Sequence, residues 1–145
     1  SRFDLAAFIA GLIYDELGAD SRDVSRHGPS PLEVTADPRL LTLALSNGLR
    51  NAIDAVALVK KEDGRHPVVV TWGQTDVDVW ISIIDAGPGL PGALDRIFEI
   101  GQTSKPEHRG FGLAVARQAM ETLGGTVTLS AAQGGGACFE LRWER

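Results

Sequence analysis

An alternating stretch that ends in a lone acid limits most strongly how this chain can fold. Apolar residues alternate from Val77 to Ile83, and the stretch ends at Asp85, followed by Gly87 and Gly89. Alternation with a period of two predicts a strand with one face in a core. At the strand end, the carboxylate can accept hydrogen bonds and the glycines let the backbone approach a ligand closely. An ordinary turn is the alternative, because these residue types are common in turns.

The other periodic stretches surround this strand with helices and further strands. Apolar residues at helical spacing predict helices over about residues 5–17, 38–60 and 113–123. Alternation predicts strands over about residues 32–35, 68–73, 126–130 and 137–143. Less regular stretches predict a helix-like start at 1–3, a loop with room for an edge strand at 19–31, a helical turn at 91–96 and a loop at 101–109.

This order of elements predicts an α+β fold. The order helix, strand, helix, strand, strand, loop, helix, strand, strand favours a two-layer sandwich with helices on one face of a mixed, mostly antiparallel sheet. Asp4, and Asp37 followed by Pro38, provide the expected N-caps of the first two helices. No linker divides the sequence, so we expect residues 1–145 to form a single domain.

Composition excludes several classes of function. The net charge of −5 disfavours nucleic-acid binding, which depends on excess lysine and arginine. No apolar run reaches membrane-spanning length, so we expect no membrane contact by this domain. Cys138 is the single cysteine, which excludes an internal disulfide and fits a reducing, cytoplasmic location. The parent protein could be either soluble or membrane-bound.

Polar side chains interrupt the second predicted helix beside its apolar stripe. Asn47, Asn51 and Asp54 lie there, although asparagine is unfavourable within a helix because its side chain competes for backbone hydrogen bonds. Two asparagines four residues apart lie on the same helix face. They form either a solvated edge or a pair of amides directed at a ligand or a metal ion.

A second glycine pair precedes the third predicted helix. Gly110 and Gly112 stand at its start, where free backbone N–H groups and the helix dipole favour phosphate. Lys105 and Arg109, in the preceding loop, add positive charge. Three features in this order, an amide that suits Mg²⁺, an acid that suits the amine of adenine, and a phosphate site, together predict a site for ATP.

In this combination the sequence resembles the ATP-binding catalytic domain of bacterial sensor histidine kinases. These kinases share the Bergerat ATP-binding fold with gyrase, the ninety-kilodalton heat-shock chaperones and MutL. The resemblance covers nearly the whole chain. The motifs that carry it are an asparagine box at 47–55, a glycine box at 85–89, a phenylalanine box at 97–99, lid residues 103–106 and a second glycine box at 109–114.

The resemblance implies a role for each of these residues. Asn51 would hold Mg²⁺ and act with Lys105 in catalysis, and Asp85 would bind the adenine amine. Gly87 and Gly89 would shape the adenine pocket. The remaining nucleotide-binding residues would be Asn47, Asp54, Phe98, Thr103, Arg109, Gly110, Gly112 and Leu113.

The resemblance also indicates phosphoryl transfer and not hydrolysis. In hydrolysing relatives a glutamate four residues before the magnesium asparagine activates water, whereas this chain has Asn47, and an amide is no general base. The implied acceptor is a histidine on a dimerisation domain of the same parent protein, from which a response regulator would receive the phosphate. His27, His66 and His108 lie in predicted loops and turns, so we expect the acceptor histidine outside this chain.

Two other functions are compatible with the same fold. A serine kinase of the anti-sigma type would phosphorylate a protein partner and bind a sigma factor. A degenerate nucleotide-binding or docking module would bind a partner without catalysis. Ala114 and Ala137, which replace a glycine and a threonine common among relatives, motivate the second of these alternatives.

Overall fold

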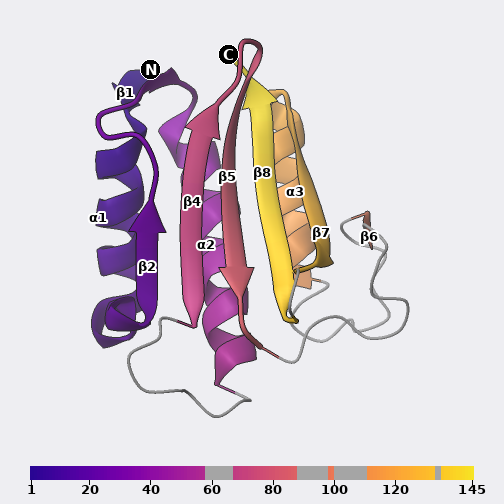
Figure 1. The fold of residues 1–145 in the computed structure, drawn as a ribbon. Helices are drawn as coiled ribbons and strands as arrows, with labels where there is room; N and C mark the ends of the chain where they lie inside the picture. Colours follow the sequence, from indigo (N-terminus) through magenta and orange to yellow (C-terminus); the bar gives the residue numbers. More distant parts are fainter. Residues whose placement is uncertain (58–66, 88–97, 100–110, 133–134) are drawn as a thin grey trace.

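The computed structural model describes residues 1–57, 67–87, 98–99, 111–132 and 135–145 (Figure 1). The helices are α1 (Leu5–Leu17), a 3₁₀ helix (Gly18–Asp23), α2 (Pro38–Val56) and α3 (Phe111–Leu123). The strands are β1 (Arg2–Asp4), β2 (Val24–His27), β3 (Glu33–Thr35), β4 (Val68–Gln74), β5 (Asp78–Asp85), β6 (Phe98–Glu99), β7 (Gly125–Ala131) and β8 (Ala137–Glu144).

The described strands form one large sheet and one small one. The large sheet has the order β2-β4-β5-β8-β7-β6, in which β2 pairs with β4 in parallel and all other neighbours are antiparallel. Strands β1 and β3 form a separate antiparallel pair. Figure 1 shows the helices on one face of the large sheet. The predicted α+β sandwich with a mixed, mostly antiparallel sheet is therefore confirmed.

The core lies between the large sheet and the helices. On β5, Val79, Ile81 and Ile83 point into it and are almost fully buried, as the alternation predicts. Helix α2 contributes a stripe at helical spacing that includes Leu41, Leu45, Leu49, Ala52 and Val56. Each large apolar side chain that is fully buried stabilises the fold by about 1.5–3 kcal/mol, so these two elements fix the centre of the domain.

Aspartates begin the first two helices, as predicted. Asp4 accepts from the backbone N–H of Ala6 (3.1 Å) and also from that of Leu32 (2.9 Å), which ties the start of α1 to the segment before β3. Asp37 accepts from the N–H of Arg39 at 2.9 Å. That bond, with the Arg39 side chain, lowers the pKa of the Asp37 carboxyl below its ordinary value.

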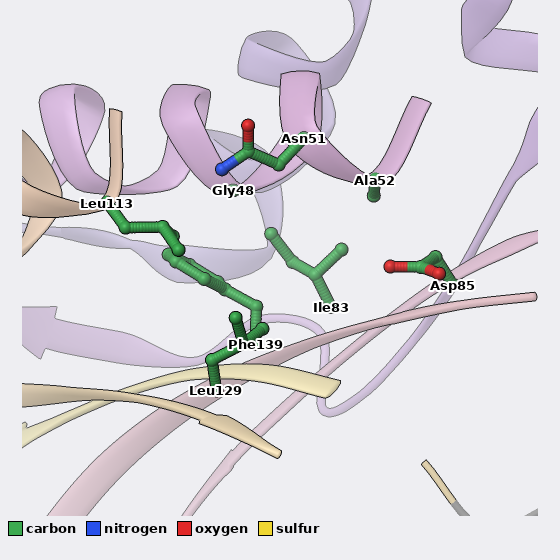
Figure 2. Close-up of a pocket in the computed structure, with 8 residues that line it drawn as sticks. All are labelled: Gly48, Asn51, Ala52, Ile83, Asp85, Leu113, Leu129 and Phe139. Carbon is green, nitrogen blue, oxygen red and sulfur yellow. The ribbon is translucent and has the colours of Figure 1, made fainter. Parts of the chain in front are cut away.

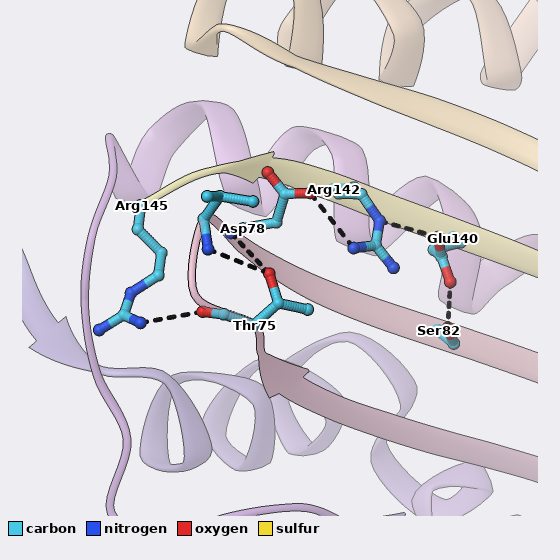
Figure 3. Close-up of polar contacts among 7 residues, drawn as sticks. Thr75, Asp78, Ser82, Glu140, Arg142 and Arg145 are labelled. Carbon is cyan, nitrogen blue, oxygen red and sulfur yellow. Dashed lines mark hydrogen bonds and ion pairs between the residues drawn. The ribbon is translucent and has the colours of Figure 1, made fainter.

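The other face of the sheet carries polar side chains that alternate with the core residues. The Arg142 guanidinium lies 3.3 Å from a carboxylate oxygen of both Asp78 and Glu140, and Ser82 donates to Glu140 at 3.1 Å (Figure 3). The ionic groups are partly exposed, so each ion pair contributes only about 0–1 kcal/mol. This cluster orders neighbouring strands at a distance from the glycine turn that follows Asp85.

The start of the chain is where the prediction was wrong. Residues 2–4 form β1 and not a helix, because their backbone pairs with β3, with Phe3 opposite Val34. The strand predicted at 32–35 is β3, which lies outside the large sheet. The loop predicted at 19–31 contains the 3₁₀ helix and the edge strand β2. The predicted turn at 91–96, the loop at 101–109 and the end of the second helix at 58–60 lie outside the described residues.

Candidate nucleotide-binding site

A pocket opens between helix α2 and the sheet, close to the end of β5. Its volume is about 240 Å³, including the open space at its mouth. Helix α2 is the largest contributor to its lining, with further residues from β5, α3, β7 and β8. The lining residues are Gly48, Asn51, Ala52, Ile83, Asp85, Leu113, Leu129 and Phe139 (Figure 2). Asn51 and Asp85 are thus the two polar side chains in an otherwise apolar lining.

Asp85 is a buried acceptor at one end of this pocket. Its exposed fraction is 6%, and its Oδ1 accepts from the backbone N–H of Gly87 at 2.9 Å. A carboxylate buried among apolar groups is unfavourable unless hydrogen bonds compensate for its lost hydration. The turn after β5 provides one such bond. The arrangement fixes the side chain so that it presents a carboxylate to the pocket.

Two glycines hold the backbone on either side of Asp85. A Cβ on Gly87 would lie 2.8 Å from the Cβ of Ala55 and 3.0 Å from the Ala55 carbonyl oxygen, so only glycine lets this turn pass the last turn of α2. Gly136, in the hairpin between β7 and β8, has a φ of +83°, and a Cβ there would overlap the backbone oxygen of Asp85. The position of Asp85 therefore depends on close backbone contacts.

Asn51 presents an amide that is unsatisfied within the described part of the chain. Its Nδ2 is buried and has no hydrogen-bond partner there. A buried polar group without a partner typically costs about 1–3 kcal/mol. Because the amide can rotate to exchange its oxygen and nitrogen, the same position can present an oxygen to a ligand.

The residues present fit a nucleotide-bound Mg²⁺. Mg²⁺ usually keeps several waters and binds through one or two protein oxygens together with substrate phosphates. Among the described residues no group of three or more histidine, cysteine, aspartate or glutamate side chains could hold a metal ion by itself. The side-chain oxygen of an amide at the pocket, Asn51, can supply one ligand to such a shared site.

Comparison with known proteins decides the family. Residues 36–145 match the family of histidine kinase-, DNA gyrase B- and HSP90-like ATPases. The chain belongs to this family. Family membership supports nucleotide binding, and the resemblance found in the sequence is confirmed. No helix among the described residues is long and apolar enough to cross a membrane.

Curated relatives of the chain include a sensor protein, a sensor histidine kinase and a nitrogen regulation protein. The chain is 36% identical to the sensor protein CitS of Halalkalibacterium halodurans over 129 residues, which are 87% of this chain and 23% of that protein. It is 39% identical to the sensor histidine kinase ZraS of Escherichia coli K12 over 111 residues, 75% of this chain and 22% of ZraS. It is 34% identical to the nitrogen regulation protein NtrY of Azorhizobium caulinodans over 116 residues, 78% of this chain and 15% of NtrY. The chain therefore spans less than a quarter of these relatives.

Solved structures share the fold. The nucleotide-free catalytic domain of histidine kinase ThkA superposes with a TM-score of 0.75 at 22% identity, covering 99% of this chain and 95% of that one. The cytoplasmic segment of histidine kinase QseC gives a TM-score of 0.63 at 17% identity, covering 100% and 78%. These likenesses concern the fold, whereas the family match and the similarity to ZraS show that the chain is an ATP-binding domain of the kind found in sensor histidine kinases.

The family's predicted nucleotide residues are partly gathered in the described pocket. Asn51, Asp85 and Leu113 line it, and Gly87 adjoins it through its bond to Asp85. Asn47 lies one turn earlier on α2 and donates from Nδ2 to the Leu43 carbonyl at 2.7 Å. The other described members are an exposed Asp54, Gly112 in the first turn of α3, and Phe98 in β6. The predicted residues outside the described part are Gly89, Thr103, Lys105, Arg109 and Gly110.

Sequence reasoning did not single out most of the apolar lining. The helical pattern over residues 38–60 includes Gly48 and Ala52 without marking them as pocket residues, and the alternation marks Ile83 only as a strand residue. A glycine inside a helix is unfavourable by about 1 kcal/mol relative to alanine, so Gly48 carried a signal of close packing. Leu129 and Phe139 had no comparable signal. They lie opposite each other on β7 and β8, a pairing that local periodicity does not reveal.

Proposed function

We propose that residues 1–145 form the catalytic domain of a two-component sensor histidine kinase, which binds Mg-ATP and transfers its γ-phosphate. The observation that carries the proposal is the buried Asp85 in an apolar pocket that also contains the unsatisfied amide of Asn51. Membership of the ATPase family supports nucleotide binding. To this we add the histidine kinase activity, the magnesium ion and the partners as proposals.

Asp85 would bind the base. Its carboxylate accepts hydrogen bonds, and adenine presents an exocyclic amine that donates them. The apolar side chains of Ile83, Leu129 and Phe139 would contact the flat ring, which favours exclusion of water. The contact with Gly87 keeps the carboxylate in place before the base arrives, so little side-chain freedom is lost on binding.

Asn51 and the start of α3 would hold the phosphate end. When bound, Mg²⁺ neutralises phosphate charge, and Asn51 would contribute one oxygen to it. The free N–H groups at the start of α3 favour an anion, and Gly112 lies in that first turn. Family resemblance adds Lys105, with Gly110, Thr103 and Arg109, from the segment before α3, and gives Asn47, Asp54, Gly89 and Phe98 supporting contacts.

Asn47 favours transfer over hydrolysis. Its side chain is an amide that donates to its own helix, so it offers no base to activate water. Phosphoryl transfer instead requires positioning and charge neutralisation. The acceptor would be a histidine on a dimerisation domain of the parent protein, followed by a response regulator. The domain would work in the cytoplasm, where ATP is available, and its net charge of −5 favours neither nucleic acid nor an anionic membrane surface.

The test combines binding with transfer. Calorimetric titration with ATP, in the presence of Mg²⁺ and in the presence of a chelator, should show tighter binding with Mg²⁺ for the native chain. Asn51→Ala should abolish most of that difference, whereas Ser46→Ala, on the same helix and outside the pocket lining, should preserve it.

The transfer experiment uses γ-labelled ATP and the full-length parent protein. We expect label on the protein that is lost in acid, as phosphohistidine is, and slow release of free phosphate by the isolated chain. Acid-stable label would indicate a serine kinase instead. Absence of ATP binding by the native chain would refute the proposal and favour a docking module.

A further inference from the structure

We propose that Phe139, held against Gly48, sets the depth of the nucleotide pocket and so determines which substituted purines it accepts. The inference rests on the proposed function, because it assumes that the base occupies this pocket. It assigns a specificity role to two residues that have no polar contact with a ligand.

At Gly48, α2 packs closely against side chains of the sheet. A Cβ on Gly48 would overlap the Cε1 atom of Phe139 and would lie 2.6 Å from its Cδ1 and 2.8 Å from the Cδ1 of Ile83. The aromatic ring therefore occupies the volume that any other residue at position 48 would fill. Phe139 is only 4% exposed and is held on strand β8, between β5 and β7.

The neighbouring strands fix the ring from below. Phe139 lies opposite Ile83 on β5 and opposite Leu129 on β7, and all three side chains line the pocket. In Figure 2 the ring lies beneath Gly48, between Leu113 and Ile83. The Phe139 ring lies between the helix and the sheet, and a closely packed side chain of this kind has little freedom to move.

Asp85 and Phe139 mark opposite ends of the pocket. Figure 2 places the Asp85 carboxylate on the far side of Ile83 from the Phe139 ring. A purine whose exocyclic amine meets Asp85 can turn only one of its other edges towards Phe139. C2 and C8 lie at opposite ends of the purine, so a group added at one of these two positions would meet the aromatic ring, whereas a group added on the amine would point the other way, past Asp85.

The experiment measures relative affinity and not affinity alone. The probes are Mg²⁺ complexes of ATP, 2-methylthio-ATP, 8-bromo-ATP and N6-benzyl-ATP, titrated into the native chain, Phe139→Leu and Phe139→Ala. We expect Phe139→Ala to lower the ratio of analogue Kd to ATP Kd about tenfold or more for the C2 or the C8 analogue, because an added methylene in an apolar pocket changes affinity by roughly 10–200-fold. The ratio for the N6 analogue should change less than twofold.

Leu141→Ala is the matched control. Leu141 is the next inward-facing residue on β8, is fully buried and does not line the pocket. It should reduce stability comparably and leave all analogue ratios within twofold of native. If Phe139→Ala does not fold, the same ratios of analogue Kd to ATP Kd are measured with Phe139→Leu. This variant removes less volume, so we expect the ratio to change by about threefold.

Gly48→Ala tests the contact from the other side. The added methyl should push the ring into the pocket and weaken ATP binding at least tenfold, and combining it with Phe139→Leu should restore most of the loss. Unchanged analogue ratios in folded Phe139 variants that bind ATP would overturn the inference while leaving the proposed function intact. Failure of the native chain to bind ATP would overturn both.

Discussion

Replacing Asp85 by asparagine tests the proposed recognition of the base with almost no change in shape. In the native structure Asp85 Oδ1 accepts from the Gly87 N–H at 2.9 Å. A carboxylate has two acceptor oxygens, whereas a carboxamide has one oxygen and one donor group. In the Asp85→Asn variant the single side-chain oxygen can accept in good geometry either from the Gly87 N–H or from the adenine amine. The other of these two donors then loses the acceptor that the carboxylate would provide.

The expected loss follows from the charge on the acceptor. A hydrogen bond to an ionised group contributes about 1.5–3 kcal/mol. At about 1.4 kcal/mol per factor of ten, Asp85→Asn should weaken Mg-ATP binding by about 10- to 150-fold. The free energy of unfolding without nucleotide should change much less, because the variant no longer buries a charge and its amide oxygen can still accept from Gly87.

The assay is calorimetric titration with ATP and with ITP, which carries a carbonyl oxygen where adenine has its amine. In the variant the new amide can donate to that oxygen, so the preference for ATP over ITP should narrow or reverse. Asp78→Asn is the control, since Asp78 lies at the other end of β5 and contacts Arg142 (Figure 3). A folded Asp85→Asn protein that binds ATP within twofold of native, with an unchanged preference, would refute the reasoning.

Three further predictions concern the elements that position the pocket. Asp4→Ala should lower the free energy of unfolding by about 1–3 kcal/mol in urea titrations, since two N–H groups lose their acceptor, whereas Asp4→Asn should stay within about 0.5 kcal/mol of native. Gly136→Ala should be destabilised by about 1–3 kcal/mol more than Gly135→Ala in the same titrations, because both have positive φ but only Gly136 abuts the Asp85 backbone; equal losses would contradict this. Burial, with the charge of Glu140, raises the pKa of the Cys138 thiol, so at pH 8 Cys138 should react with Ellman's reagent more slowly in the native chain than in the urea-unfolded chain, and Glu140→Gln should narrow the difference.

Local patterns were sufficient for the elements that carry the polar site residues. The alternation that ends at Asp85 predicted β5, and the spacing of apolar residues predicted α2, because each element is selected by one buried face. The N-caps Asp4 and Asp37 were equally readable, since a cap depends only on its immediate neighbours. What a residue does to its own segment could thus be predicted.

Relations between distant segments could not be predicted in the same way. Strand β1 exists because β3 supplies a partner about thirty residues away, and its own sequence reads as the start of a helix. The position of β8 between β5 and β7 places Phe139 beneath Gly48, although no local pattern connects these two residues. Helical spacing places Asn47 and Asn51 on the same face of α2, yet only Asn51 lines the described pocket. Asn47 lies one helical turn earlier and donates to the Leu43 carbonyl of its own helix.

Two residues of α2 that line the pocket, Asn51 and Gly48, are unfavourable for the stability of a helix. The Asn51 Nδ2 atom has no hydrogen-bond partner among the described residues, and an amide left without a partner in this apolar lining would lower the stability of the nucleotide-free protein more than one exposed to water. Nucleotide binding that satisfies the amide would recover the loss only in the complex, so part of the binding free energy arises from relief of an unfavourable free state. Gly48 shows the complementary case, because a helix-weakening residue is retained where it lets Phe139 pack. Residues that are unfavourable within a helix thus occur twice where α2 lines the pocket, Asn51 with a polar group and Gly48 with space for an aromatic ring.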